Sequence, residues 1–132
     1  MKPFLGSYSS QIYSVTRMVV GFLFWQHGAQ KLLGAFGQEQ TVELFSRVGL
    51  AGVIEFVGGG LIALGLFTPA VAFVASGEMA AAFFLAHYPR GGWPVQNAGE
   101  PAVLFCFVFL FFATRESGIW SLDRLIRARD KK

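Results

Sequence analysis

Apolar residues run along the chain in long blocks that short polar segments separate. A helix needs roughly 20 residues to cross a bilayer. The blocks that approach this length lie at about 12–33, 50–67, 69–88 and 98–114. Residues 50–88 contain no Lys or Arg, but this segment is too long for one span. Pro69 divides it into two spans, because proline suits only the first turn of a helix. The pattern predicts an all-α integral membrane four-helix bundle made of two hairpins.

The polar segments predict two further short helices. A short interfacial helix is expected between the first two spans, because four of its residues share one helical face: Val42, Phe45, Val48 and Gly49. The tail, residues 115–132, contains "WSLDRLIRARDKK", which predicts a basic amphipathic helix with Ser121 as its cap. Residues 1–132 are therefore expected to form a single membrane domain.

The composition agrees with a membrane protein, because 54% of the residues are hydrophobic and only 14% are charged, against about 25% charged residues in soluble domains. The net charge of +3 is unevenly distributed. The predicted side of the termini carries Lys2, Arg115, Arg124, Arg127, Arg129, Lys131 and Lys132, and the opposite side carries Lys31, Arg47 and Arg90. This bias predicts that both termini are cytoplasmic. It also explains the basic pI without a nucleic-acid partner, and the tail charges suit anionic lipid.

Polar residues on all four predicted spans lie at a similar depth in the outer half of the bilayer. They are His27, Lys31, Glu55, His87, Asn97 and Glu100, with Glu78 deeper and Arg17 towards the inner side. A charge in the bilayer costs several kcal/mol unless it is paired or hydrated. We therefore expect these side chains to face the bundle interior, where Lys31 would pair with Glu55 or Glu100.

Glycines accompany these polar residues and would allow the helices to approach closely. Gly28 shares a helical face with His27 and Lys31, and Gly58 and Gly59 follow Glu55 by about one turn. The polar residues and glycines together predict a polar pocket that opens towards the outer leaflet.

Three segments resemble the DoxX family of small bacterial membrane proteins: "HGAQKLLGAFG", "GLAGVIEFVGGGLIALGLFTPAVA" and "GIWSLDRLI". The resemblance runs from about Arg17 to Leu125. It implies a four-helix bundle in the bacterial inner membrane, and it assigns the family's recurrent His, Lys and Glu to His27, Lys31 and Glu55. Because some relatives are subunits of thiosulfate:quinone oxidoreductases, it also implies a quinone-linked subunit or accessory of a redox system.

On this interpretation His27 and Lys31 would contact the oxygens of a quinone, while Glu55 would carry protons or hold Lys31. Haem bound by His27 and His87 is less favoured, because two isolated histidines are a weak signal, and no third residue gives a zinc spacing. The one cysteine, Cys106, excludes a Cys-x-x-Cys redox pair. Electrons would then come from a redox protein partner or a bound cofactor, which disfavours a stand-alone enzyme.

Two other classes of function remain open from the sequence. In a structural or assembly protein, the charged residues would only tie helices together. In a small transporter, Glu78 would connect the outer pocket to the inner side. The glycine-rich faces also permit a homo-oligomer.

Overall fold

The computed structural model describes residues 1, 3–38 and 40–130. Lys2, Lys131 and Lys132, whose charges entered the predicted topology, lie outside the described residues. The elements are η1 (Gly6–Tyr8), α1 (Ser9–Leu33), α2 (Arg47–Val53), η2 (Ile54–Gly58), α3 (Gly59–Leu64), α4 (Thr68–Ala82), η3 (Phe83–His87), η4 (Tyr88–Arg90), α5 (Pro94–Asn97), α6 (Glu100–Ala113) and α7 (Leu122–Arg129). The described part contains no strand, so the all-α prediction is confirmed.

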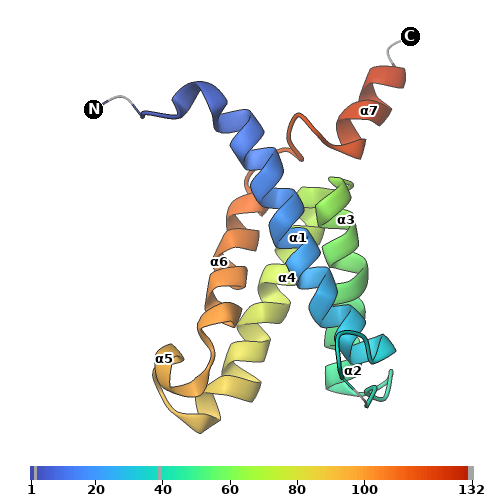
Figure 1. Ribbon diagram of the computed structural model, residues 1–132, viewed down its shortest axis with the longest axis vertical. Coiled ribbons are helices and arrows are strands. Elements are labelled where there is room, and N and C mark those ends of the chain that lie inside the picture. Colours follow the sequence, from blue (N-terminus) through green and yellow to red (C-terminus); the bar gives the residue numbers. More distant parts are fainter. Residues whose placement is uncertain (2, 39, 131–132) are drawn as a thin grey trace.

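The long helices of the described part form four rods. The first is α1, the second is the continuous helix Arg47–Leu64, the third is Thr68–Arg90 and the fourth is α6. The first rod packs against the second and the third against the fourth. Figure 1 shows that these two pairs diverge at the end that carries α2 and α5, and that both termini lie at the opposite end. The second and third rods are long and apolar enough to cross a membrane.

Glycines end two of the helices, and prolines lie in the first turns of two others. Gly34 and Gly65 adopt left-handed conformations, with φ of 64° and 73°, and they end α1 and α3. Pro69 and Pro101 lie in the first turns of α4 and α6, where a missing N–H costs no hydrogen bond. The observed rods therefore begin and end within a few residues of the predicted spans.

The predicted interfacial helix is wrong. Residues 35–38 and 40–46 are loop and turn, and Val48 and Gly49 belong to the start of α2 instead. Phe36 and Gly37 have positive φ values of 56° and 82°, which a right-handed helix cannot accommodate. Ser46 then caps α2, because its Oγ accepts a hydrogen bond from the Gly49 N–H at 2.9 Å.

The first two rods touch backbone to backbone at three glycines, Gly21, Gly28 and Gly59. A Cβ added to Gly28 would lie 2.2 Å from the Phe56 nitrogen, and a Cβ added to Gly59 would lie 2.4 Å from the Trp25 nitrogen. Gly58 is different, because its added Cβ would meet only the Val71 side chain, at 3.4 Å. Gly21, Gly28 and Gly59 therefore set the spacing between the rods, and Gly58 does not.

The tail folds back to the end of the second rod. The predicted tail helix is confirmed as α7, and the Ser121 Oγ accepts a hydrogen bond from the Arg124 N–H at 3.3 Å. Arg17 is fully buried and donates hydrogen bonds to the carbonyl oxygens of Ile62, Ala63 and Trp120. Arg17 thus joins the C-terminal end of α3 to the tail.

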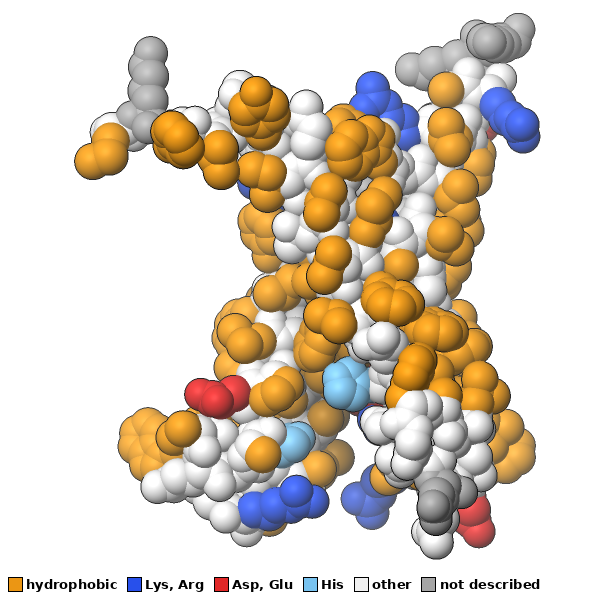
Figure 2. All heavy atoms as spheres, viewed as in Figure 1, with side chains coloured by type: hydrophobic (Ala, Val, Ile, Leu, Met, Phe, Trp, Pro, Cys, Tyr) orange, Lys and Arg blue, Asp and Glu red, His pale blue; other side chains and the backbone are white. Residues whose placement is uncertain are grey.

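Apolar side chains fill the interior and also cover the outside. The buried core includes Phe24, Ile62, Ala72, Ala75, Phe109 and Phe112. Large apolar side chains on the outer faces of α4, η3 and α6 are exposed, among them Phe73, Phe84, Leu85, Leu104 and Phe107. Figure 2 shows apolar side chains along the full length of the rods. An exposed apolar surface of this extent is typical of contact with lipid or with another protein.

Candidate functional site

The clearest polar contact between the rods is an ion pair between the first and the second. The Nζ of Lys31, near the end of α1, lies 2.5 Å from the Oε1 of Glu55 in η2. The Glu55 side chain is only 3% exposed, whereas that of Lys31 is 29% exposed. Of the two partners expected for Lys31, Glu55 is therefore the one that binds it.

The backbone around this pair brings the two side chains together. Gly28 precedes Lys31 by less than one turn and packs on the backbone of Phe56, the residue after Glu55. A Cβ added to Gly52, one turn before Glu55, would lie 3.2 Å from the Lys31 Cβ. Glu55 itself lies in a π-helical segment, Ile54–Gly58. Single π-helical turns inside α-helices are frequent at functional sites.

A second acid, Glu78, approaches the pair from α4. α4 packs against the π-helical segment η2, which contains Glu55. In the described part of the chain, the Oε2 atoms of both Glu55 and Glu78 are buried without a hydrogen-bond partner. Burying a polar atom without a partner is costly, so each oxygen favours a hydrogen-bond donor.

His27 completes the arrangement, and we call His27, Lys31, Glu55 and Glu78 the acid–base cluster. His27 is exposed and precedes Lys31 by about one turn of α1. Its ring meets the ring of Phe105 on α6 edge to face, with the centroids 6.0 Å apart. All four rods therefore contribute to the acid–base cluster or its border. Phe105 was not predicted, because nothing distinguishes it from the other phenylalanines of α6.

The surface near the acid–base cluster is hollowed. Figure 2 shows a notch between the two pairs of rods at the end opposite the termini, and both histidines of the chain lie beside it. The exposed imidazole of His27 and the partly exposed ammonium of Lys31 can therefore be reached from outside the protein.

His87 and Asn97 are hydrogen-bonded to each other and shape the connection between the third and fourth rods. The His87 Nδ1 lies 3.1 Å from the Asn97 carbonyl oxygen. Buried Asn97 donates to the Gly91 carbonyl oxygen at 2.6 Å and accepts from the Gly99 N–H at 2.8 Å. These contacts hold a loop in place, and none of them joins His87 or Asn97 to the acid–base cluster.

The remaining predicted residues are placed elsewhere. Glu100 is exposed in the first turn of α6, where a carboxylate favours the helix dipole. Neither ion pair found in the described part includes Glu100. Arg17 lies at the opposite end of the molecule, where it binds backbone carbonyl groups. Among residues 1, 3–38 and 40–130, no three His, Cys, Asp or Glu side chains gather closely enough to hold a metal ion.

Comparison with known proteins places this arrangement in a family. The DoxX family model matches residues 12–88, which include the whole acid–base cluster. An uncharacterized protein of Haemophilus influenzae is 36% identical, in an alignment that covers 90% of this chain and 93% of the relative. No solved structure matches the chain.

Proposed function

The chain belongs to the DoxX family of membrane proteins, and we propose that its four rods form a four-helix bundle across the bacterial inner membrane. The length and apolar character of the second and third rods support this proposal, as do the apolar side chains exposed along the outside. Both termini lie at one end (Figure 1), and the arginines at 115, 124, 127 and 129 belong to that end. Under the positive-inside rule, these arginines support a cytoplasmic location for this end.

We expect cysteine labelling of intact cells to reproduce this orientation. In a Cys106→Ala background, a membrane-impermeant maleimide should label Gln38→Cys, in the exposed loop after α1, without permeabilisation. It should label Asp130→Cys, just after α7, only once the inner membrane is opened. Both positions are exposed, so the difference reports the side of the membrane and not burial. The reverse pattern would contradict a cytoplasmic tail.

Within this bundle, we propose that the acid–base cluster binds the oxygen-bearing head of a quinone. One observation carries the proposal: the Lys31–Glu55 pair is exposed on its lysine side, next to an exposed histidine and a notch. A pair that served only to hold two helices together would gain nothing from this access. His27 and Lys31 provide donors for carbonyl oxygens. The unpartnered carboxyl oxygen of Glu78 provides a place to hold a proton, and Phe105 offers an aromatic face beside His27.

The protein would act as a quinone-linked subunit of a redox system. A bound quinone takes up electrons together with protons. The chain has one cysteine, so it has no dithiol of its own to supply the electrons. A separate redox protein would therefore deliver the electrons, while Glu55 and Glu78 handle protons beside the quinone oxygens.

The test is the quinone content of the purified protein. Wild type extracted in a mild detergent should retain quinone in its lipid extract. His27→Ala should reduce the quinone content about ten-fold, because a lost hydrogen bond to a polar head group costs on the order of 1 kcal/mol or more. His87→Ala is the comparison variant: this histidine also lies beside the notch (Figure 2), but its ring binds the Asn97 carbonyl group, so its loss should lower the quinone content less than the loss of His27.

Circular dichroism and gel filtration should show that both histidine variants remain folded. A folded wild type without quinone, or equal losses in the two histidine variants, would contradict the proposal. A Soret absorption band in the same sample would instead favour haem bound by His27 and His87.

Transport is the weaker candidate function. A path from Glu78 to the cytoplasmic end would have to pass the part of α4 that contains Ala72 and Ala75. Both residues are fully buried in the apolar core with Phe24 and Phe109. This packing disfavours a continuous polar route through the bundle.

A further inference from the structure

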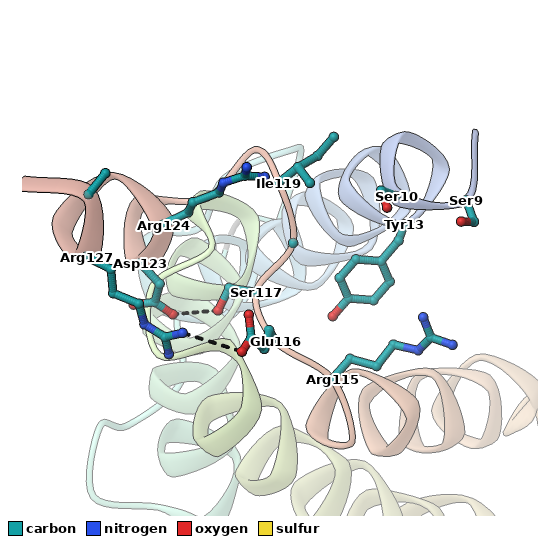
Figure 3. Close-up of a pocket in the computed structure, with 12 residues that line it drawn as sticks. Ser9, Ser10, Tyr13, Arg115, Glu116, Ser117, Ile119, Asp123, Arg124 and Arg127 are labelled. Atoms are coloured by element: carbon teal, nitrogen blue, oxygen red, sulfur yellow. Dashed lines mark hydrogen bonds and ion pairs between the residues drawn. The ribbon is translucent and has the colours of Figure 1, made fainter. Parts of the chain in front are cut away.

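A cavity of about 590 Å³ lies at the end of the molecule that carries both termini, far from the notch. It lies between the start of α1, the segment after α6, and α7 (Figure 3). Its polar lining includes Ser10, Tyr13, Arg115, Ser117, Arg124 and Arg127. We call this cavity the arginine groove.

The acids of the arginine groove already have partners. The Asp123 carboxylate accepts hydrogen bonds from the Phe67 N–H at 3.0 Å and the Ser117 hydroxyl at 2.5 Å. Glu116 forms a solvent-exposed ion pair with Arg127, with 3.5 Å between Oε1 and Nη1. In the described part of the chain, Arg115 and Arg124 form no ion pair. Three arginines, Arg115, Arg124 and Arg127, face two carboxylates in the lining, so the groove carries a net charge of about +1.

Two further features favour an anion. The guanidinium of Arg115 lies over the rings of Tyr13 and Phe111, with 5.8 Å and 4.6 Å to the centroids, which fixes its position. The Tyr13 hydroxyl is buried without a hydrogen-bond partner in the described part. Figure 3 shows Tyr13 between the arginines, with its hydroxyl turned towards Glu116 and Ser117. This hydroxyl can donate to a bound oxygen.

The position of the groove relative to the membrane indicates which kind of molecule carries the anion. On α7, Arg124 and Arg127 line the groove, while Leu122, Leu125 and Ile126 are exposed on the other side of the helix. A short helix with this division lies in the membrane interface, with its apolar face towards the acyl chains. The exposed Tyr8 at the start of α1 also suits the headgroup layer. The groove would then lie at the level of the lipid phosphates.

We propose that the arginine groove binds the phosphate of an anionic phospholipid headgroup. Arg124 would donate charge-assisted hydrogen bonds to the phosphate oxygens, because a guanidinium group matches their geometry. Arg115, which lies on the other side of Tyr13 in Figure 3, would add the longer-range attraction of its charge. The Tyr13 hydroxyl would donate a further bond. The lipid would also bridge α1 and α7, which contribute to opposite walls of the groove (Figure 3). This proposal is independent of the ligand bound at the notch.

The test is native mass spectrometry of the full chain in a neutral detergent. Titration with dioctanoyl phosphatidylglycerol should show saturable binding of one molecule, much tighter than that of dioctanoyl phosphatidylcholine. Arg124→Gln should weaken this binding about ten-fold, the expected loss for one hydrogen bond to a charged group. Arg129→Gln is the matched control, because Arg129 lies on the same helix but does not line the groove. It should change the affinity less than about two-fold.

Tyr13→Phe provides a second variant, because it removes only the unpartnered hydroxyl and keeps the ring under Arg115. It should weaken lipid binding by a few-fold. Equal losses in Arg124→Gln and Arg129→Gln would overturn the proposal in favour of diffuse attraction by the tail. Binding of inorganic phosphate as tight as that of phosphatidylglycerol, and equally dependent on Arg124, would overturn it in favour of a soluble phosphate compound.

Discussion

Gly28→Ala is expected to separate the first two rods and to lower the free energy of unfolding by about 3 kcal/mol, the upper part of the range for overpacked interiors. The added Cβ would lie 2.2 Å from the Phe56 nitrogen, 2.6 Å from its Cα and 2.7 Å from the Gly52 carbonyl oxygen. All three atoms belong to backbone, so no side chain can turn aside. Contacts of carbon with heavy atoms are favourable at about 3.5–4 Å, and the helices would have to move apart by about 1 Å.

The measurement is unfolding in mixed micelles of a mild detergent and sodium dodecyl sulfate. Gly77→Ala is the matched control, because Gly77 lies on α4 and a Cβ added there meets nothing within 4 Å. This variant should be as stable as wild type or slightly more stable, since alanine favours a helix over glycine. If Gly28→Ala and Gly77→Ala unfold alike, the backbones of the first two rods are not in contact. If only Gly28→Ala is unstable, the same variant should also weaken the Lys31–Glu55 pair.

The sequence predicts the rods well because their signals are local. Apolar length, the absence of charge and the position of Pro69 determine the spans without knowledge of distant contacts. The predicted helix at 35–38 and 40–46 is wrong because the conformation of these residues depends on individual turns. Phe36 adopts a left-handed conformation that few non-glycine residues adopt, and hydrophobic periodicity does not report it. The hydrogen bond from the Val42 N–H to the Lys31 carbonyl oxygen also depends on tertiary structure.

The sequence predicts the depth of the site residues in the membrane, but not which of their side chains contact each other. The cost of a charge in the bilayer indicated that Lys31 needs an acid, and Glu55 is that acid. Depth did not show which side chains face each other. His87 was therefore grouped with His27, although its ring binds the Asn97 carbonyl group instead.

The arginine groove was harder to predict, because its parts are far apart in the chain. Tyr13 and Arg124 line the same cavity but are more than 100 residues apart. In the sequence, Arg124 and Arg127 contribute only to the charge bias that orients the protein. The groove exists only in the folded protein, where Arg17 binds the Trp120 carbonyl group and holds the tail against α1.

Removing one member of the Lys31–Glu55 pair is expected to cost more than removing both. Lys31→Met leaves Glu55 3% exposed and without its cation. Breaking a buried pair in this way typically costs about 3–5 kcal/mol, whereas replacing both partners by apolar residues is often neutral. Because Lys31 is partly exposed, we expect about 3 kcal/mol for Lys31→Met. The double variant Lys31→Met/Glu55→Met should recover to within about 1 kcal/mol of wild type.

The double variant separates the stabilising role of the pair from its role in binding. If the pair only ties helices together, as in an assembly protein, a stable double variant should have the same quinone content as wild type. If the acid–base cluster binds quinone, the double variant should be folded and stable but should contain little quinone, because both the ammonium donor and its carboxylate are gone. Unfolding in mixed micelles and quinone extraction from the same preparation measure the two quantities. A stable double variant with wild-type quinone content would show that the ligand binds elsewhere.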